Sequence, residues 1–385
     1  MALLTLAQTM KLHILAEGIG ITQAARGRLT DALGSQKLSS FDYASTSGII
    51  LELEPDVWVN APVTDHNANF VVAPSCVLDV DAQGLLVRCG EGEVRASYCR
   101  QPRFHHDPGE WGGRPGRDSL MDYVVSHADR ARLSPLHGCS MVCDFCNIPF
   151  DVPMRDYTLF PIERCVQALR IAVDDPEQPA RHIMVSGGTP KPKDVANHRE
   201  LYACLLRTFP DVPIDIMMVP VQGIFDLDGL ASLGVGELSI NLEVFDPECE
   251  QKVARGKFHV GRQHYLDFIE EATNALGPCR VRSMLMVGLE PMESTMAGVR
   301  AIAERGGVPV LSPFRPDPAT PLKDMRSSTF IELRETYLRA REAAELLGAS
   351  LGPSCPPCTH NTVSFADDAA GNIIYRWDKP VMMEV

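Results

Sequence analysis

The sequence predicts an α/β fold: a partial (β/α)6, TIM-like barrel with a β-rich N-terminal extension and a C-terminal lid segment. From about residue 130, six apolar β-like runs alternate with helical patterns, which is typical of parallel strands that close towards a barrel. Shorter β-like runs precede this region, and a cysteine-bearing tail follows the last helix. We therefore expect a helix and β-rich region over 1–125, the barrel over 126–325, and a helix with a lid or tail over 326–385.

The composition restricts the class of protein. The chain has 385 residues, is 45% hydrophobic and carries a formal net charge of −14. An acidic chain lacks the basic surface that nucleic acids and anionic membranes usually require, and no apolar run reaches the roughly 20 residues that span a bilayer. The first 33 residues lack a basic start and a cleavage site, so they predict a helix rather than a signal peptide. The 12 cysteines are mostly scattered, which favours a reducing, cytoplasmic location.

In the N-terminal region, β-like runs are expected over 48–54, 57–63, 69–81 and 84–98. The sequence Asp-Ala-Gln-Gly at 81–84 predicts a hairpin turn between the last two runs. The Gly- and Pro-rich stretch 105–119 predicts a linker.

In the barrel region, strands are expected over 132–138, 181–188, 215–220, 237–244, 280–288 and 308–314. Helical patterns lie between them over 160–174, 193–208, 264–276 and 295–305, and a final long helix is expected over 327–349. The carboxyl ends of such strands form the mouth of a barrel, where sites are built.

Three thiols follow the first of these strands. Cys139, Cys143 and Cys146 have the spacing C-x3-C-x2-C. A disulfide would use two of them and leave the third, and tetrahedral zinc would normally require a fourth protein ligand. A [4Fe–4S] cluster is held by thiolates on its irons, so three thiolates leave one iron open for a small ligand.

This spacing, with Phe145 just before the last cysteine, resembles the signature of the radical S-adenosylmethionine (SAM) superfamily. The resemblance implies that the open iron binds SAM, and that electron transfer cleaves SAM to a 5′-deoxyadenosyl radical. It also implies an electron donor such as flavodoxin or ferredoxin.

Two strand ends downstream support the resemblance. Ser186, Gly187, Gly188 and Thr189 end the second strand, where the family usually has Gly-Gly-Glu and binds the amino group of SAM. Here Thr189 replaces the acid, so backbone and hydroxyl groups are expected to make that contact. In the fourth strand, the alternation of Ser239, Asn241 and Glu243 places three polar side chains on one face. Biotin and lipoyl synthases have a similar Asn-x-acid pair that binds SAM; a buried structural network is the alternative.

The fifth and sixth strands resemble the same two synthases. Arg282 would face the SAM carboxylate in one register and Ser283 in the other, and the backbone from Val287 is expected beside the adenine. Arg315 follows the sixth strand. It is expected either to hold a substrate carboxylate or phosphate, or to form a surface salt bridge.

A second cysteine group lies in the tail. Cys355, Cys358 and His360 form C-x2-C-x-H. Three interpretations are open: an auxiliary iron–sulfur cluster completed by His360 or a distant thiol, a zinc site, or redox-active thiols close to the substrate. The cysteine arrangements that serve sulfur donation in lipoyl and biotin synthases are both absent.

Together these features predict a radical SAM enzyme with [4Fe–4S] and SAM as cofactors and a small-molecule biosynthetic substrate. Sulfur insertion, transfer, rearrangement and C–C bond chemistry all remain open. The alternative is a non-catalytic protein that uses the same thiols to bind zinc as a scaffold.

Overall fold

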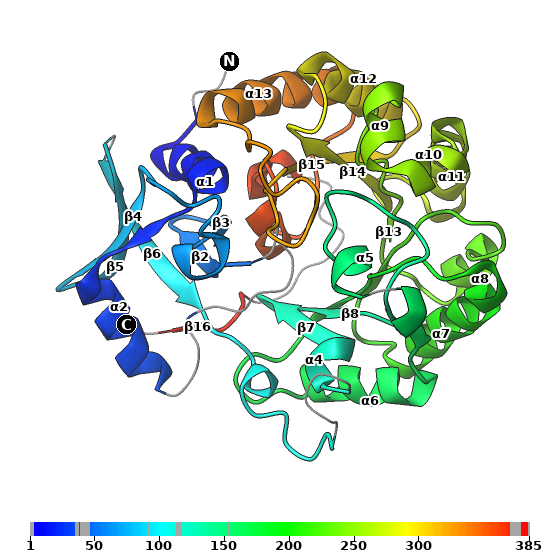
Figure 1. Ribbon diagram of the computed structural model, residues 1–385, viewed down its shortest axis with the longest axis horizontal. Helices are drawn as coiled ribbons and strands as arrows, with labels where there is room; N and C mark the ends of the chain where they lie inside the picture. The colour runs from blue at the N-terminus through cyan, green and yellow to red at the C-terminus, as the bar shows by residue number, and fades with distance from the viewer. Residues whose placement is uncertain are drawn as a thin grey trace.

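The computed structural model describes residues 4–34, 38, 47–90, 92–112, 118–152, 154–369 and 379–383. It contains a curled, mostly parallel sheet surrounded by helices and a second, mostly antiparallel sheet beside it (Figure 1). No helix of the described residues is long and apolar enough to cross a membrane.

The parallel sheet forms the partial barrel. Its order is β15-β14-β13-β12-β11-β8-β7, with six parallel strands: β8 (Arg130–Leu133), β11 (His182–Val185), β12 (Ile214–Met217), β13 (Leu238–Ser239), β14 (Val281–Val287) and β15 (Val308–Pro313). The prediction of six parallel strands is confirmed. The sequence did not predict β7 (Val124–His127), which pairs antiparallel with β8 at the sheet edge.

Helices cover the outer face of this sheet (Figure 1). The predicted helices correspond to α6 (Ile162–Val173), α7 (Val195–Thr208), α11 (Arg262–Leu276), α12 (Met292–Ala303) and α13 (Phe330–Leu346). In α6 the buried residues Cys165, Ala168, Leu169 and Ala172 follow the helical period and pack towards the sheet. Shorter elements were not predicted: α5 (Ile148–Asp151), α8 (Leu227–Ser232), α9 (Pro247–Val253), α10 (Arg255–Val260), β9 (Leu136–His137), β10 (Thr158–Leu159), and the 3-10 turns Met154–Asp156 and Pro192–Asp194.

The N-terminal region begins with two helices, not one. α1 (Leu6–Glu17) is capped by Thr5 and ends at Gly18, and α2 (Gln23–Leu33) follows the short strand β1 (Gly20–Ile21). Gly18 has φ +77°, a left-handed conformation that glycine adopts without strain and that ends the first helix.

The second sheet has the order β1-β4-β5-β6-β2-β3. Its strands are β2 (Ile49–Leu53), β3 (Val57–Ala61), β4 (Val77–Asp81), β5 (Gly84–Cys89) and β6 (Gly92–Cys99), and β16 (Met382–Met383) pairs with β6. Asp81 pairs with Gly84, which confirms the predicted hairpin. The short helix α3 (Thr64–Asn67) and the 3-10 turn Arg103–His105 belong to the N-terminal region, whereas α4 (Leu120–Tyr123) packs against β7 and α6 of the barrel. Of the predicted linker, residues 113–117 lie outside the described residues.

The C-terminal segment with the second cysteine pair lies between the two sheets (Figure 1). It contains the 3-10 turns η4 (Pro357–Asn361) and η5 (Ala366–Ala369). The Val363 amide donates to the carbonyl of Leu311 in β15, and Lys11 of α1 donates from Nζ to the carbonyls of Thr359 and Ser364 at 2.8 and 2.6 Å. Because these contacts tie the segment to strands and to α1, it closes the open side of the barrel.

Candidate functional site

A cavity of about 260 Å³ occupies the inside of the partial barrel. The three predicted cluster cysteines line it at the carboxyl ends of the strands, and Cys358 and Asn361 of the C-terminal segment line it as well. The lining also includes most residues that were predicted to bind SAM or substrate: Phe145, Ser186, Gly187, Thr189, Ser239, Asn241, Glu243, Arg282 and Arg315. Of that set, Gly188 and Val287 are not among the residues that line the cavity.

The cysteine loop is held against the end of β11. The amides of Thr189 and Met141 donate to Cys139 Sγ at 3.2 and 3.3 Å, a type of contact that stabilises a thiolate over a thiol. A Cβ added to Gly188 would lie 1.8 Å from the carbonyl oxygen of Gly138. Gly188 therefore allows the backbone just before Cys139 to pass directly against the β11 end.

The three thiols suit a cluster better than a single metal ion. Within the described part of the chain, the one group of three ligand atoms that all lie within 4.8 Å of one another is His182, Cys355 and Cys358; the loop thiols are spread more widely. A single tetrahedral zinc ion, with Zn–S bonds of about 2.3 Å, would bring its sulfur ligands to roughly 3.8 Å from one another. This spacing argues against the zinc-scaffold alternative at the loop.

Burial favours the protonated form of two of the loop thiols, Cys143 and Cys146, while no metal is bound. It raises the pKa of Cys146 to about 12 and the pKa of Cys143 well above its ordinary value. Buried thiolates are costly without a compensating cation, and iron provides that compensation while displacing the protons. The donor set of three thiols and two amide donors therefore fits a [4Fe–4S] cluster.

The polar face predicted on the fourth strand lines the cavity. Ser239 Oγ donates to Asn241 Oδ1 at 2.8 Å, and the Met284 amide donates to the same oxygen at 3.1 Å. Glu243, which has φ +67°, forms an ion pair of 2.7 Å with Lys257 of α10. Burial acts to lower the pKa of Lys257, but the Glu243 carboxylate outweighs it and the net shift is upward.

The β11 end and Phe145 line further parts of the cavity. Ser186 Oγ is 3.4 Å from the sulfur of Met217, and Gly187 has φ +124°. Phe145 packs against an apolar group that includes Met286 and Phe314, so it lies on the β14 side. The cavity lining therefore combines sulfur and aromatic surface with hydroxyl, amide and charged groups.

Arg282 lines the cavity, but its guanidinium forms ion pairs with carboxylates at the base of the barrel. It forms ion pairs with Glu237, which directly precedes β13, and with Asp215 of β12. Ser283 instead accepts a hydrogen bond from the Leu242 amide at 3.1 Å. The register places Arg282 inside the barrel, at the amino ends of the strands and away from the cysteine loop.

The stretch after β14 is held by its own backbone and by Glu290. The Val287 carbonyl accepts from the Phe314 amide, and Glu290 accepts from the amides of Phe245 and Asp246 at 2.7 and 2.6 Å. Glu290 thus connects the β14 turn to the loop after Glu243.

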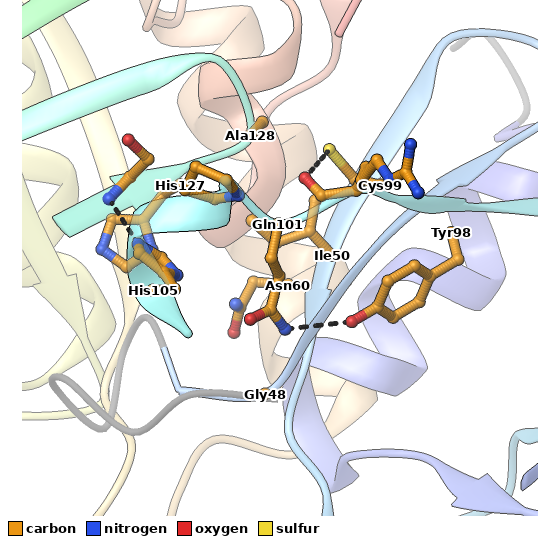
Figure 2. Close-up of a pocket in the computed structure, with 12 residues that line it drawn as sticks. Gly48, Ile50, Asn60, Tyr98, Cys99, Gln101, His105, His127 and Ala128 are labelled. Carbon is orange, nitrogen blue, oxygen red and sulfur yellow. Dashed lines mark hydrogen bonds between the residues drawn. The ribbon is translucent and has the colours of Figure 1, made fainter. Parts of the chain in front are cut away.

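Arg315 is buried and held by the N-terminal sheet. Its guanidinium donates to Asn60 Oδ1 at 3.1 Å and to the Asn60 carbonyl at 3.0 Å. Figure 2 shows Asn60 in the junction between the N-terminal sheet and the barrel, with His105 and His127 across a small cavity of about 30 Å³. Burial lowers the pKa of Arg315 to about 9, so an anion beside it in the cavity would offset part of the cost of burying its charge.

The second cysteine pair lies at the base of the cavity, not over its mouth. Cys355 and Cys358 form a disulfide, and Cys358 Sγ is 3.7 Å from Nδ1 of His182. His182 begins β11, at the opposite end from the cysteine loop, so the expectation of a lid is wrong. His360, the histidine nearest in sequence, lies beside His127 with a ring centroid distance of 6.1 Å.

Several residues of the cavity wall were missed from the sequence. They are Arg130, Arg132, Lys257 and Asp317. Arg130 and Arg132 alternate on β8, so the period-two argument applied to strand four would have found them. Lys257 and Asp317 carry no such local signal, because their partners are brought close by the tertiary fold.

Comparisons with known proteins agree with this geometry. Residues 133–297 match the family model of the radical SAM superfamily. The FeMo cofactor biosynthesis protein NifB of Frankia alni is 24% identical over 179 residues, which cover 42% of this chain and 34% of NifB. The chain thus spans about a third of the length of the curated relative that it matches.

Solved structures show weaker likeness. HydG, a maturase of the [FeFe]-hydrogenase, is 11% identical with a TM-score of 0.45, covering 57% of this chain and 50% of that chain. A radical SAM methyltransferase from Sphaerobacter thermophilus is 15% identical with a TM-score of 0.43, covering 75% of this chain and 81% of that chain. From the family match and the cysteine spacing, residues 133–297 form a radical SAM enzyme domain.

Proposed function

We propose that this enzyme binds a [4Fe–4S] cluster and SAM in the barrel cavity and acts there on a small biosynthetic substrate. The observation that carries the proposal is that the three loop thiols and the polar wall of strands four and five line one cavity. When bound, the cluster supplies the electron that cleaves SAM to a 5′-deoxyadenosyl radical.

The residues around the loop would hold the cofactors. Cys139, Cys143 and Cys146 would ligate the cluster, and the amides of Met141 and Thr189 would stabilise the Cys139 thiolate. The hydroxyls of Ser186 and Thr189 would then take the place of the missing acid and bind the SAM amino group. Phe145, beside the last cysteine, would shield the cluster from water.

The opposite wall would orient the rest of SAM. Ser239, Asn241 and Glu243 would bind its ribose or methionyl part, with Lys257 holding the Glu243 carboxylate in place. The backbone at Val287 would lie beside the adenine. This Asn-x-Glu arrangement supports a place near the biotin and lipoyl synthase branch.

The far part of the cavity favours an anionic substrate. Arg130, Arg132 and Arg315 line it together with Asp317, so cations outnumber carboxylates there although the whole chain carries a net charge of −14. A planar guanidinium such as that of Arg315 binds a carboxylate or phosphate through two parallel hydrogen bonds. A small metabolite with one such group would be held by Arg315 while the radical removes one of its hydrogens, leading to sulfur insertion, rearrangement or C–C bond chemistry.

The proposal is tested on anaerobically reconstituted full-length protein with dithionite or a flavodoxin or ferredoxin as electron donor. Wild type should contain iron and sulfide, show a reduced-cluster electron paramagnetic resonance signal that changes with SAM, and release 5′-deoxyadenosine. Cys143→Ala should lose all three properties, whereas Cys204→Ala, in α7 away from the cavity, should keep them. Wild-type cleavage rates in Cys143→Ala would refute the cluster assignment.

A further inference from the structure

The C-terminal cysteine pair forms, with a histidine of the barrel, a group of metal-ligand atoms separate from the cluster loop. His182, Cys355 and Cys358 each offer one ligand atom, and these atoms all lie within 4.8 Å of one another. Their residues are 0%, 1% and 3% exposed. The two sulfurs are joined in a disulfide, so the group can hold a single ion only after reduction, when the two thiolates can separate to the roughly 3.8 Å that tetrahedral zinc requires.

A carboxylate fixes the orientation of His182. Its Nε2 is 2.7 Å from Asp215 Oδ2, and both side chains are fully buried. An ionised carboxylate only accepts hydrogen bonds, so Nε2 carries the proton and Nδ1 presents its lone pair to Cys358 Sγ. This is the carboxylate–histidine–metal arrangement that orients histidine ligands in metal sites.

The backbone and its neighbours fix the two cysteines. The Cys358 amide donates to Cys355 Sγ at 3.3 Å, a contact that would also suit a Cys355 thiolate once the disulfide is reduced. Ser354, just before the pair, donates from Oγ to Glu237 at 2.8 Å, and Glu237 is paired with Arg282. The positions of both thiols relative to His182 are therefore set by β13 and β14.

Charge balance also favours a cation. Reduction of the disulfide by an external dithiol, with two electrons and two protons, yields two thiols in a buried site. Binding of a divalent ion releases two protons and pairs the two thiolates with two positive charges. The network beside the site has two carboxylates, Asp215 and Glu237, against the one guanidinium of Arg282, so its excess negative charge also favours a cation.

We propose that His182, Cys355 and Cys358 bind one zinc-type divalent ion at the base of the cavity, with Asp215 as the residue that positions His182. The fourth coordination position opens towards the cavity, because Cys358 lines it. Three protein ligands and one open position are typical of zinc sites that bind a water or a substrate heteroatom. The site does not depend on the function proposed above, since none of its ligands belongs to the cysteine loop.

The test uses full-length protein that is purified anaerobically with a thiol reductant. The loop cluster is reconstituted first, and the protein is then exposed to Zn²⁺ or Co²⁺ and desalted. We expect one ion per chain, with thiolate-to-cobalt charge-transfer absorption for Co²⁺. Zinc should protect Cys355 and Cys358, but not Cys204, from alkylation, as measured by mass spectrometry. This assay uses the wild-type protein, so it does not require any variant to fold.

Variants identify the ligands. Cys355→Ser, Cys358→Ser and His182→Gln should each lose the ion, whereas His360→Gln should retain it, since His360 packs beside His127 instead. Asp215→Asn should keep binding but with roughly 10–100-fold weaker affinity. Circular dichroism verifies that each variant is folded.

Three outcomes would overturn the proposal. Reduced wild type that retains no ion and alkylates at both cysteines would show a redox pair rather than a metal site. Iron and sulfide beyond one cluster that disappear in Cys355→Ser would show an auxiliary cluster. Loss of the ion in folded His360→Gln, with retention in His182→Gln, would show that the third ligand is wrongly assigned.

Discussion

Gly188→Ala is expected to disable the cluster loop without removing any ligand. The new Cβ would lie 1.8 Å from the Gly138 carbonyl oxygen and 2.9 Å from Cys139 Cα, whereas real Cβ contacts essentially never fall below 3.0 Å. The two backbones must therefore separate by at least the difference of 3.0 and 1.8 Å, which is 1.2 Å.

This displacement acts directly on the first cluster ligand. Metal–ligand distances tolerate only about 0.2 Å, and the hydrogen bond from the Thr189 amide to Cys139 Sγ would also be lost. Overpacking of this kind costs about 1–3 kcal/mol of folding free energy, a loss that a chain of this size should survive. Misplacement by about 1 Å can lower a catalytic rate roughly a hundredfold.

The assay compares iron content, the reduced-cluster paramagnetic signal and 5′-deoxyadenosine release after anaerobic reconstitution. Gly27→Ala is the matched control, because a Cβ there meets nothing within 4 Å and alanine favours the helix. Gly188→Ala should fold but lose most of its iron and nearly all SAM cleavage. Wild-type iron content and cleavage in Gly188→Ala would refute the close-packing argument for the loop.

Two further predictions concern buried charges. Glu243→Gln should weaken SAM binding roughly tenfold or more, since a hydrogen bond to a charged group contributes about 1.5–3 kcal/mol. Glutamine can still accept a hydrogen bond from Lys257, so the fold around it should be kept. An unchanged affinity for SAM in calorimetry would assign Glu243 to a structural network. Burial lowers the pKa of Lys11 from 10.5 to about 7, against the opposing effect of Asp368. Between these two values the unfolded chain binds more protons than the folded chain, so this group makes the free energy of unfolding rise with pH. Urea unfolding below pH 7 and near pH 10 should show a larger rise for wild type than for Lys11→Met, and an equal rise in both would contradict the burial of a neutral amine.

The barrel could be predicted because its signals are local. Most of the six strands lie in apolar runs, although β8 carries two arginines, and α6 places Cys165, Ala168 and Leu169 at helical spacing, so the pattern indicates both kinds of element. β7 was missed because it follows α4 directly, with no turn residue to mark where the strand begins. The N-terminal helix was predicted as one because the break at Gly18 leaves apolar residues on both sides.

The partners within the site could not be predicted, because they come from distant elements. His360 is two residues from Cys358 in sequence, yet His182 is the histidine that faces it. Arg282 carries no local sign that Asp215 and Glu237 would occupy its guanidinium at the base of the barrel. The lid prediction was wrong for the same reason: the contacts of Lys11 with residues at 359 and 364 decide where the tail lies.

The contacts of Lys11 also have a consequence for the order of assembly. Its two acceptors lie 348 and 353 residues further along the chain, so these hydrogen bonds form only after residues 359–364 have been synthesised, and contacts of such separation are slow to form. The wall that the C-terminal segment completes is thus the last to close. Until then the cavity is open on this side as well as at its mouth, which gives iron, sulfide and a divalent ion a second entry route.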